Sequence, residues 1–440
     1  MSRFFNWLGF FAVLYLLTPP AWLCADDAKE VPQALYDYVR QPDDVFAWKV
    51  KEKRNAGTVS IQNLEVTSQR WQDIVWKHHV AVFEPAQNAH PRHVFLFVTG
   101  GRTGREPGNG DLVLGLKLAE LTQSRVAMLF QVPNQPLMGD RVEDDLITET
   151  WLRYLQTGDA TWPLLFPMVK SAVRTMDAIQ QFAEKEWNTQ VDGFIIAGAS
   201  KRGWTSWLTP VVDRRVIGTV PMVIDTLNFH AQMRHQLDTW GQFSEQIIDY
   251  SSKGLIKLES ETPREQSLRT MMDPYTYRRQ LALPKLLVHG TNDRYWVVDA
   301  TRFYWHDLVG PKYILQVPNA GHGLEGGREK AVATVAAFYR HTVAGKPLPV
   351  LNWEHQDENE AWTLKVRADQ PPAAARLWVA LSDTRDFREA RWNAEPLEKQ
   401  AESYLGRITK PQGRHVARYA ELEFEYEGLA YSLCTLIETD

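Results

Sequence analysis

The chain has 440 residues, of which 44% are hydrophobic and 23% charged, and this length and composition predict a globular protein with two domains. Its net charge of −5 argues against a nucleic-acid binder, because such proteins normally present a basic face. We interpret most of the 17 tryptophans as core and rim packing rather than as platforms for sugar stacking.

The first 25 residues have the pattern of a secretory signal peptide. Arg3 gives a positive start, and an apolar run follows at residues 7–17. That run is short for a membrane span, so an uncleaved anchor is the weaker alternative. A lipid-modified Cys24 is also disfavoured, because Leu23 stands where a small residue should precede it.

Removal of residues 1–25 leaves Cys434 as the only cysteine, so an intramolecular disulfide is impossible. We therefore expect a soluble, periplasmic or secreted protein, without a stable membrane span after cleavage, that depends on its hydrophobic core.

Strand and helix signals alternate from about residue 72. Strands are expected at residues 74–85, 93–101, 124–133, 192–198, 217–225, 285–290 and 313–318. Helices are expected at residues 112–123, 166–186 and 326–344, with a long helical stretch between 226 and 282. This alternation predicts an α/β fold with a parallel sheet covered on both faces.

The composition changes at residues 345–355, which we interpret as a linker between a first domain (26–344) and a second (356–440). Beyond it, apolar and polar residues alternate at 362–368, 375–382, 417–426 and 429–437. This pattern predicts a small antiparallel β-sandwich that packs on the first domain or extends it.

Three residues suggest nucleophilic catalysis. Ser200, Asp293 and His322 each follow a predicted strand, in the chain order of the α/β-hydrolase triad. Each alone could be a turn former, a helix cap or a solvated loop residue. Together they predict that His322 activates Ser200 while Asp293 orients the imidazole.

An oxyanion hole is expected beside Ser200. The backbone N–H of Lys201 would be one donor, because it lies at the start of the following helix. Gly100 or Gly101 would supply the second from a glycine-rich loop, which also holds Arg102 as a candidate substrate-binding residue. A flexible surface loop is the alternative, and a phosphate loop is disfavoured because no Gly-Lys-Ser/Thr follows.

The turn departs from the usual G-x-S-x-G pattern. Gly198 and Ser200 fit, but Arg202 takes the place of a small residue and Gly203 comes one position later. Lys201 and Arg202 could bind an anionic or carbonyl group of the substrate, or they could pair with carboxylates of a cap, and both hypotheses stay open.

A helical cap is expected at residues 226–282, between the strand after Ser200 and the strand before Asp293. Residues that could line its pocket, if they do not serve packing or capping, are Asp225, Asn228, Trp240 and Tyr250. His230 and His235 are five residues apart, which suits one helix face poorly, so we expect neither a metal nor a cofactor.

The segments "AGASKRGWTSW", "PMVIDTLN", "HGTNDRYW" and "PNAGHG" resemble the PhoPQ-activated pathogenicity-related family of exported bacterial proteins. The resemblance extends over nearly all of the mature chain, including "ALSDTRDFREARW" in the second domain. It implies an α/β-hydrolase fold with a Ser200–Asp293–His322 triad and a link to virulence and to survival against antimicrobial peptides. The turn is also similar in outline to glucuronoyl and acetyl esterases, which keeps a carbohydrate-ester substrate open.

The sequence thus predicts an exported serine hydrolase that forms an acyl-enzyme on a small-molecule or peptide substrate. A peptidase and an esterase remain alternatives, since the same triad serves both. A different hypothesis is a non-catalytic binding factor on a hydrolase fold, and replacement of Ser200 by alanine would distinguish it from an enzyme.

Overall fold

A mixed β-sheet forms the centre of the fold. The computed structural model describes residues 31–440, so the expected signal peptide and Cys24 lie outside the described residues. In spatial order the strands are β1 (Ala47–Ala56), β2 (Val59–Trp71), β3 (Ile74–Glu84), β5 (Arg125–Leu129), β4 (His93–Val98), β6 (Gly193–Ala199), β7 (Val216–Met222), β8 (Lys285–Gly290) and β9 (Lys312–Val317).

The sheet has an antiparallel part and a parallel part. Strands β1, β2, β3 and β5 pair antiparallel, whereas β5, β4, β6, β7, β8 and β9 pair parallel. The parallel strands are short apolar runs buried along most of their length, as expected for a sheet covered on both faces. The exchanged positions of β4 and β5, with a serine turn after β6, define an α/β-hydrolase fold.

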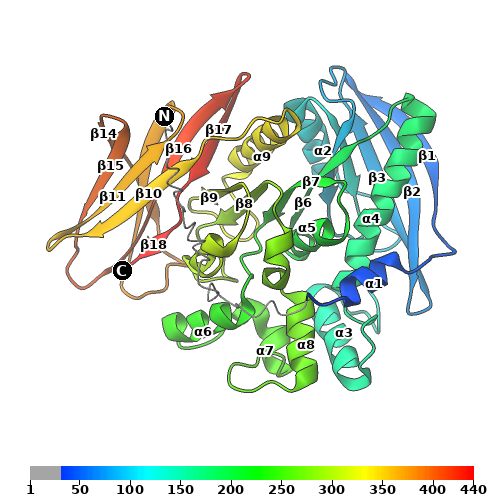
Figure 1. Ribbon diagram of the computed structural model, residues 1–440, viewed down its shortest axis with the longest axis horizontal. Helices are drawn as coiled ribbons and strands as arrows, with labels where there is room; N and C mark the ends of the chain where they lie inside the picture. Colours follow the sequence, from blue (N-terminus) through cyan, green and yellow to red (C-terminus); the bar gives the residue numbers. More distant parts are fainter. Residues whose placement is uncertain (1–30) are drawn as a thin grey trace, which may run out of the picture. The chain divides into compact units, whose positions relative to one another are not determined.

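Helices cover both faces of this sheet (Figure 1). On one face α4 packs against α1 and α5, and on the other α2 packs against α9. Their bounds are α1 (Ala34–Arg40), α2 (Asn109–Thr122), α4 (Leu165–Phe182, continued by the π-turn Ala183–Trp187), α5 (Lys201–Val212) and α9 (Arg328–Val343).

The segment between β7 and β8, expected as a cap, contains short helices rather than one long helix. They are α6 (Phe229–Trp240), α7 (Ile248–Ser252) and α8 (Pro263–Met272), with 3₁₀ turns at Glu245–Ile247 and Pro274–Gln280. A further helix, α3 (Glu143–Thr157), comes from the β5–β6 connection and packs against α7 and α8. In Figure 1 these helices lie together below the sheet.

The C-terminal part forms two antiparallel sheets. One has the order β10 (Leu351–Asp357), β11 (Ala361–Ala368), β15 (Ser403–Thr409) and β14 (Glu398–Gln400). The other has the order β13 (Trp392–Pro396), β12 (Ala374–Ser382), β16 (His415–Tyr426) and β17 (Leu429–Cys434), with β18 (Glu438–Thr439) beside β16. Strand β10 begins inside the segment 345–355 that was expected as a linker, and β17 packs on β9 and α9.

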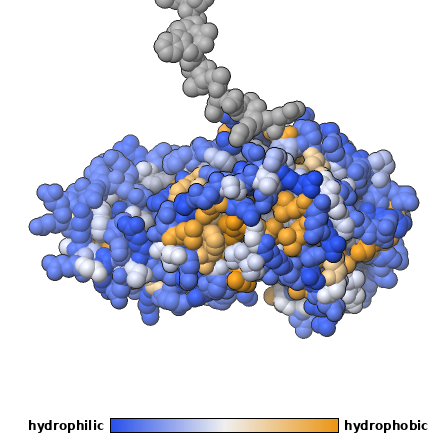
Figure 2. All heavy atoms as spheres, turned by 90° about the horizontal axis from the view of Figure 1, so that it is seen from below, coloured by the Kyte–Doolittle hydropathy of each residue, from blue (hydrophilic) through white to orange (hydrophobic). Residues whose placement is uncertain are grey.

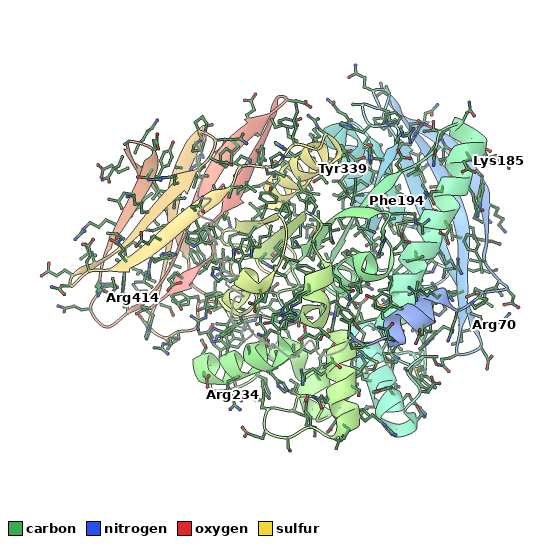
Figure 3. The ribbon with its side chains drawn as sticks, viewed as in Figure 1. Arg70, Lys185, Phe194, Arg234, Tyr339 and Arg414 are labelled. Atoms are coloured by element: carbon green, nitrogen blue, oxygen red, sulfur yellow. The ribbon has the colours of Figure 1, made fainter. Side chains whose placement is uncertain are left out.

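Charged side chains lie at the surface of the fold, and apolar side chains lie between its layers. Figure 3 shows Arg234 and Arg414 at the periphery, while Phe194 on β6 and Tyr339 on α9 lie inside, where both are fully buried. Figure 2, seen from below, shows apolar residues gathered in the middle of the face and hydrophilic residues at its ends. Among residues 31–440, none of the helices combines the length and the apolarity that a membrane span requires.

Candidate active site

Ser200 lies on a sharp turn between β6 and α5. Its backbone has φ 56° and ψ −125°, a left-handed conformation that costs free energy in any residue with a side chain. The turn is held on β7, where the N–H of Ser200 donates to the carbonyl of Met222 at 2.9 Å. Such strain is characteristic of functional turns, because it projects the side chain away from the sheet.

Two glycines allow this turn to pack closely. A Cβ atom on Gly198 would lie 2.5 Å from the carbonyl oxygen of Arg202. One on Gly203 would lie 2.6 Å from Ile224 Cγ2 and 2.9 Å from the carbonyl oxygen of Met222. Gly203, one position later than the usual motif has it, is therefore the glycine that brings α5 against β7.

Ser200, His322 and Asp293 form a chain of hydrogen bonds. Ser200 Oγ lies 2.9 Å from His322 Nε2, and His322 Nδ1 lies 2.8 Å from Asp293 Oδ2. The second Asp293 oxygen, Oδ1, accepts the backbone N–H of Tyr295 at 3.0 Å. Since a carboxylate only accepts, Nδ1 carries the proton and Nε2 is left to accept the hydroxyl proton of Ser200.

A second polar group lies next to this chain. Lys201 Nζ is 2.6 Å from Asp144 Oδ2, and the Tyr250 hydroxyl donates to Asp144 Oδ1 at 2.8 Å. Burial works against the charge of Lys201, but the Asp144 carboxylate keeps its pKa above the ordinary value. The ring of Tyr295 lies over that of His322, with 4.3 Å between the centroids and 33° between the planes.

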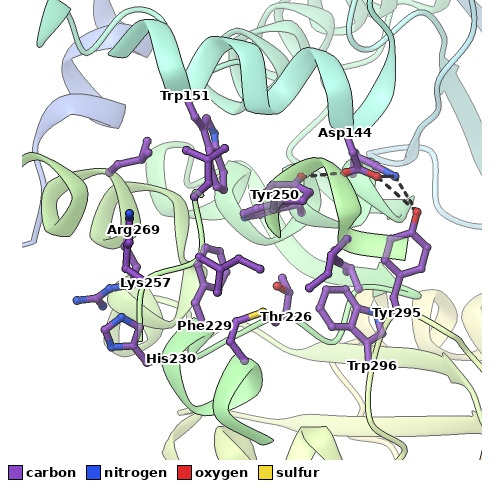
Figure 4. A pocket seen from close by; sticks show the side chains of 18 of the residues that line it. Asp144, Trp151, Thr226, Phe229, His230, Tyr250, Lys257, Arg269, Tyr295 and Trp296 are labelled. Carbon is purple, nitrogen blue, oxygen red and sulfur yellow. Dashed lines mark hydrogen bonds and ion pairs between the residues drawn. The ribbon is translucent and has the colours of Figure 1, made fainter. Parts of the chain in front are cut away.

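Both groups open into one pocket of about 110 Å³ (Figure 4). Ser200 and His322 line one end, and the helices α3, α5, α6, α7 and α8 supply the walls. Most of the lining is apolar or aromatic, including Trp151, Trp204 and Phe229. A few polar side chains at the end of a largely apolar cavity are a typical arrangement for a small-molecule site.

Arg202 does not line this pocket. Its guanidinium donates two hydrogen bonds to Glu143, at 2.7 and 2.8 Å, and a third to the carbonyl of Val132 at 2.6 Å. Burial alone would raise the pKa of Glu143, but Arg202 outweighs it and lowers that pKa to about 2. Of the two hypotheses for Arg202, the structure therefore favours pairing with a carboxylate over contact with the substrate.

Apart from Tyr250, the remaining candidate substrate residues lie outside the pocket lining. Asp225 is buried behind Asp293 and accepts the hydroxyl of Thr301 at 2.7 Å. Asn228 is the residue before α6, in a left-handed conformation, and its side chain donates to the carbonyl of Phe303.

Trp240 ends α6, and the Arg388 guanidinium lies 4.1 Å from the centre of its ring. Arg102 is exposed in the loop after β4. Tyr250, which was a candidate pocket residue of the expected cap, does line the pocket.

The expected oxyanion donors come from two segments, the start of α5 and the loop after β4. Lys201 is the first residue of α5. The carbonyl of Gly100 accepts the N–H of Gln131 at 2.7 Å, and a Cβ atom on Gly100 would lie 2.6 Å from the Arg202 guanidinium. Gly101 has φ +121°, a conformation that favours glycine.

Several pocket residues were not predicted from the sequence, among them Asp144, Trp151, Trp204 and Tyr295. Asp144 and Trp151 lie on α3, for which no helix was expected. Its three acidic residues in the first turn and Gly158 at its end are helix signals that could have identified it.

The two histidines of the cap are engaged separately. His230 Nε2 lies 3.2 Å from Glu261, and His235 Nε2 lies 2.6 Å from Asp299. Within residues 31–440, no three or more His, Cys, Asp or Glu side chains are placed so that they could share a metal ion.

Comparison with known proteins gives a family and a set of similar structures. The model of a family described as PhoPQ-activated pathogenicity-related protein matches residues 35–388. Autocrine proliferation repressor protein A of Dictyostelium discoideum is 31% identical over 376 residues, which are 80% of this chain and 76% of that protein.

Among solved structures, acetyl xylan esterase 1 from Thermoanaerobacterium sp. JW/SL YS485 is 16% identical, with a TM-score of 0.49 over 72% of this chain and 95% of the other. A glucuronoyl esterase from Solibacter usitatus is 13% identical, with a TM-score of 0.46 over 71% of this chain and 92% of the other.

Proposed function

The chain belongs to the PhoPQ-activated pathogenicity-related family and has an α/β-hydrolase fold, and from these premises we propose that it is a serine hydrolase with Ser200 as its nucleophile. The observation that carries the proposal is the chain of hydrogen bonds from Ser200 Oγ to His322 Nε2 and from His322 Nδ1 to Asp293. A serine hydroxyl needs this arrangement to react, because a base must remove its proton as it attacks.

The proposed reaction passes through an acyl-enzyme. Ser200 attacks the carbonyl carbon of an ester or a peptide bond while His322 Nε2 takes the hydroxyl proton. Asp293 stabilises the imidazolium, and the backbone N–H of Lys201 stabilises the oxyanion together with a donor from Gly100 or Gly101. His322 then protonates the leaving group and activates the water that releases the acid.

We assign residues 226–282, together with α3, to a cap that selects the substrate and excludes bulk water. We also propose that the C-terminal sheets form a second domain, which includes β10 and therefore begins at Leu351 rather than at 356. The sequence of residues 1–25 supports export to the periplasm or beyond, and the family description supports a part in virulence.

The test is labelling with a fluorophosphonate probe, which reacts with activated serines. We expect the purified mature protein to be labelled and the Ser200→Ala variant to lose all labelling. Ser252→Ala is the matched control, because Ser252 is an exposed serine on α7 outside the pocket, and it should be labelled at the normal rate. Equal labelling of Ser200→Ala and the wild type would refute the assignment of the nucleophile.

A further inference from the structure

Two hollows of different character meet at His322. The first is the pocket of about 110 Å³ that also contains Ser200. The second is a groove of about 320 Å³ that His322 also lines, with polar residues along it such as Asn292, Arg294 and Arg388. Tyr295 lines both as well, so the two hollows adjoin at His322 and Tyr295.

The middle of the pocket is walled by aromatic rings that pack edge to face. The ring of Trp151 lies 5.3 Å from Tyr250 and 5.9 Å from Trp204, and Trp204 lies 5.5 Å from Phe229. The indole N–H of Trp204 is fixed by the carbonyl of Met272 at 2.7 Å. Figure 4 shows Trp151, Tyr250 and Phe229 around the space between the two ends of the pocket. Such walls are rigid and apolar, and they favour an apolar group.

The charges at the two ends of the pocket are already paired. At the far end, Arg269 donates two hydrogen bonds of 2.8 Å to Glu261, and His230 lies against the same carboxylate. At the near end, Asp144 is engaged by Lys201 and Tyr250. A charged substrate group would have to break one of these pairs, which disfavours a charged group in the pocket.

The groove has the opposite composition. Arg294 is 45% exposed and pairs with Glu245 and Glu389, while Arg388 pairs with Glu245 and Asp386. Arg294, Glu245 and Glu389 present donors and acceptors to solvent, whereas the side chain of Arg388 is only 12% exposed. Such a surface suits the hydroxyl groups of a polar molecule.

The chemistry of the proposed reaction assigns one half of the substrate to each hollow. The acyl carbon becomes bonded to Ser200 Oγ, which lines only the first of the two. The leaving oxygen receives its proton from His322 Nε2 and therefore lies beside the imidazole, from which the alcohol can extend into the adjoining groove that His322 also lines.

We propose that the substrate is an ester of an uncharged apolar acid with a polar, hydroxyl-bearing alcohol, an inference that rests on the proposed serine hydrolase activity. The Ser200 Oγ–carbonyl bond forms as the hydroxyl proton passes to His322. The bond to the alcohol oxygen then breaks, and that oxygen takes the proton. Water adds to the acyl-enzyme by the reverse path, so the acid is released and the Ser200 hydroxyl is restored.

The volume of the pocket limits the acyl group. A cavity of about 150 Å³ holds benzene, so about 110 Å³ suits a short chain or a ring of at most that size. An acetyl group would leave most of the aromatic wall without contact.

The first experiment compares p-nitrophenyl acetate, butyrate, hexanoate and benzoate with the purified protein. We expect kcat/KM to rise about three- to fourfold for each added methylene until the pocket is full, because each is removed from water. The second compares the butyrate esters of methanol and of glycerol by titration of the released acid. We expect the glycerol ester to react several-fold faster.

Variants connect these preferences to the two hollows. Met233 lines the pocket, so Met233→Phe should lower the ratio of hexanoate to acetate hydrolysis about tenfold. Ile248→Ala is the control on the same cap, since Ile248 is 59% exposed and outside the lining, and it should leave that ratio unchanged. Arg388→Gln should reduce the preference for the glycerol ester.

The outcomes separate this inference from the function on which it depends. Fluorophosphonate labelling at Ser200 with acetate as the best of the four acyl esters would overturn the apolar acid and leave the hydrolase in place. Equal rates for the methanol and glycerol esters would overturn the polar alcohol. Absence of both labelling and hydrolysis would overturn the proposed function itself.

Discussion

The two oxygens of Asp293 have different partners, and this difference decides what a substitution there will do. Oδ2 accepts from His322 Nδ1, while Oδ1 accepts the backbone N–H of Tyr295. A backbone N–H cannot change its role, so an asparagine at this position would turn its carbonyl oxygen toward Tyr295 and its NH₂ group toward the imidazole.

We predict that Asp293→Asn slows fluorophosphonate labelling of Ser200 by about 10³- to 10⁴-fold. The NH₂ group facing Nδ1 would force the imidazole proton onto Nε2, which could then no longer accept the hydroxyl proton of Ser200. Single-turnover labelling measures the effect, and the circular dichroism spectrum checks the fold. Labelling at the normal rate in a folded variant would show that His322 is not oriented through Asp293.

Glu143 and Arg202 give a second prediction, which concerns stability. The carboxyl of Glu143 is charged far below its ordinary range because Arg202 lowers its pKa from 4.5 to about 2. A depressed pKa in the folded protein stabilises it above the unfolded value, and the contribution is lost as the pH falls from about 4.5 to about 2.

We therefore expect Glu143→Gln to lower the free energy of unfolding by about 1–2 kcal/mol at pH 7, a modest value because the carboxylate is partly exposed. The difference from the wild type should shrink as the pH falls below about 4.5. Urea unfolding at pH 7, 4 and 3 measures it. A difference that is constant over this range would mean that the charge of Glu143 contributes nothing.

At the scale of elements, the junction of β6, α5 and β7 determines where Ser200 lies. α5 can approach β7 only because Gly203 has no side chain, since a Cβ atom there would meet Ile224 and the backbone of Met222. The usual motif places this glycine two residues after the serine, but here that position belongs to Arg202, whose side chain is used to hold Glu143 on α3.

We predict that Gly203→Ala destabilises the protein by about 1–3 kcal/mol and slows labelling of Ser200, because α5 must move away from β7. Gly110→Ala is the matched control. Gly110 is also in the first turn of a helix, α2, but a Cβ atom there meets nothing within 4 Å. That substitution should be neutral or stabilise by up to about 1 kcal/mol. Thermal unfolding of both variants decides the matter, and equal stabilities would contradict the packing argument.

The elements that the sequence predicted best were those with a strong local pattern. The buried strands β6, β8 and β9 were expected within one or two residues, because a short apolar run between glycines or polar turns is typical of a buried strand. Ser200, Asp293 and His322 follow these three strands, and their order alone was enough to predict that the three side chains lie close together.

Other elements could not be obtained in this way. The hairpin of β1 and β2 is largely polar on its exposed side, and α3 follows a long irregular connection, so neither has a dominant pattern. Asp144 depends on α3 for its position and was missed for that reason. The partner of Arg202 was left open because Glu143 is 59 residues away in sequence, a distance at which only the packed structure decides.

At the scale of the whole molecule, the C-terminal sheets are joined to the hydrolase sheet through buried polar contacts. Glu421 on β16 is fully buried, and it accepts from Lys330 on α9 at 2.6 Å and from Ser432 at 2.7 Å. A buried carboxylate is tolerated only with such partners, so the two parts depend on each other for stability. Residues Pro32–Asp440 accordingly form one unit by their contacts.

The same C-terminal part holds the loops that carry the site. The side chain of Asn292, next to Asp293, donates to the carbonyl of Ala390 at 2.7 Å. Asn319, three residues before His322, donates to the carbonyl of Trp392 at 3.0 Å and accepts its N–H at 2.8 Å. The segment after β12 thus fixes the loops of Asp293 and His322 at their outer side, which gives the C-terminal sheets a positioning role in the proposed reaction.

We predict that Asn319→Asp slows labelling of Ser200 about tenfold with only a small loss of stability. The substitution keeps the size of the side chain and its tolerance for the left-handed backbone found there, φ 56°, but it places a carboxylate against the carbonyl of Trp392. The loop that carries His322 would then lose one of its two bonds to the C-terminal part, and the imidazole would be less well held against Ser200. Asn393→Asp is the control, because Asn393 is exposed and its amide contacts only the nearby carbonyl of Arg391. If both variants are labelled at the normal rate, the C-terminal part stabilises the fold without positioning the site; if only Asn319→Asp is slow, and its unfolding temperature is close to normal, the positioning role is established.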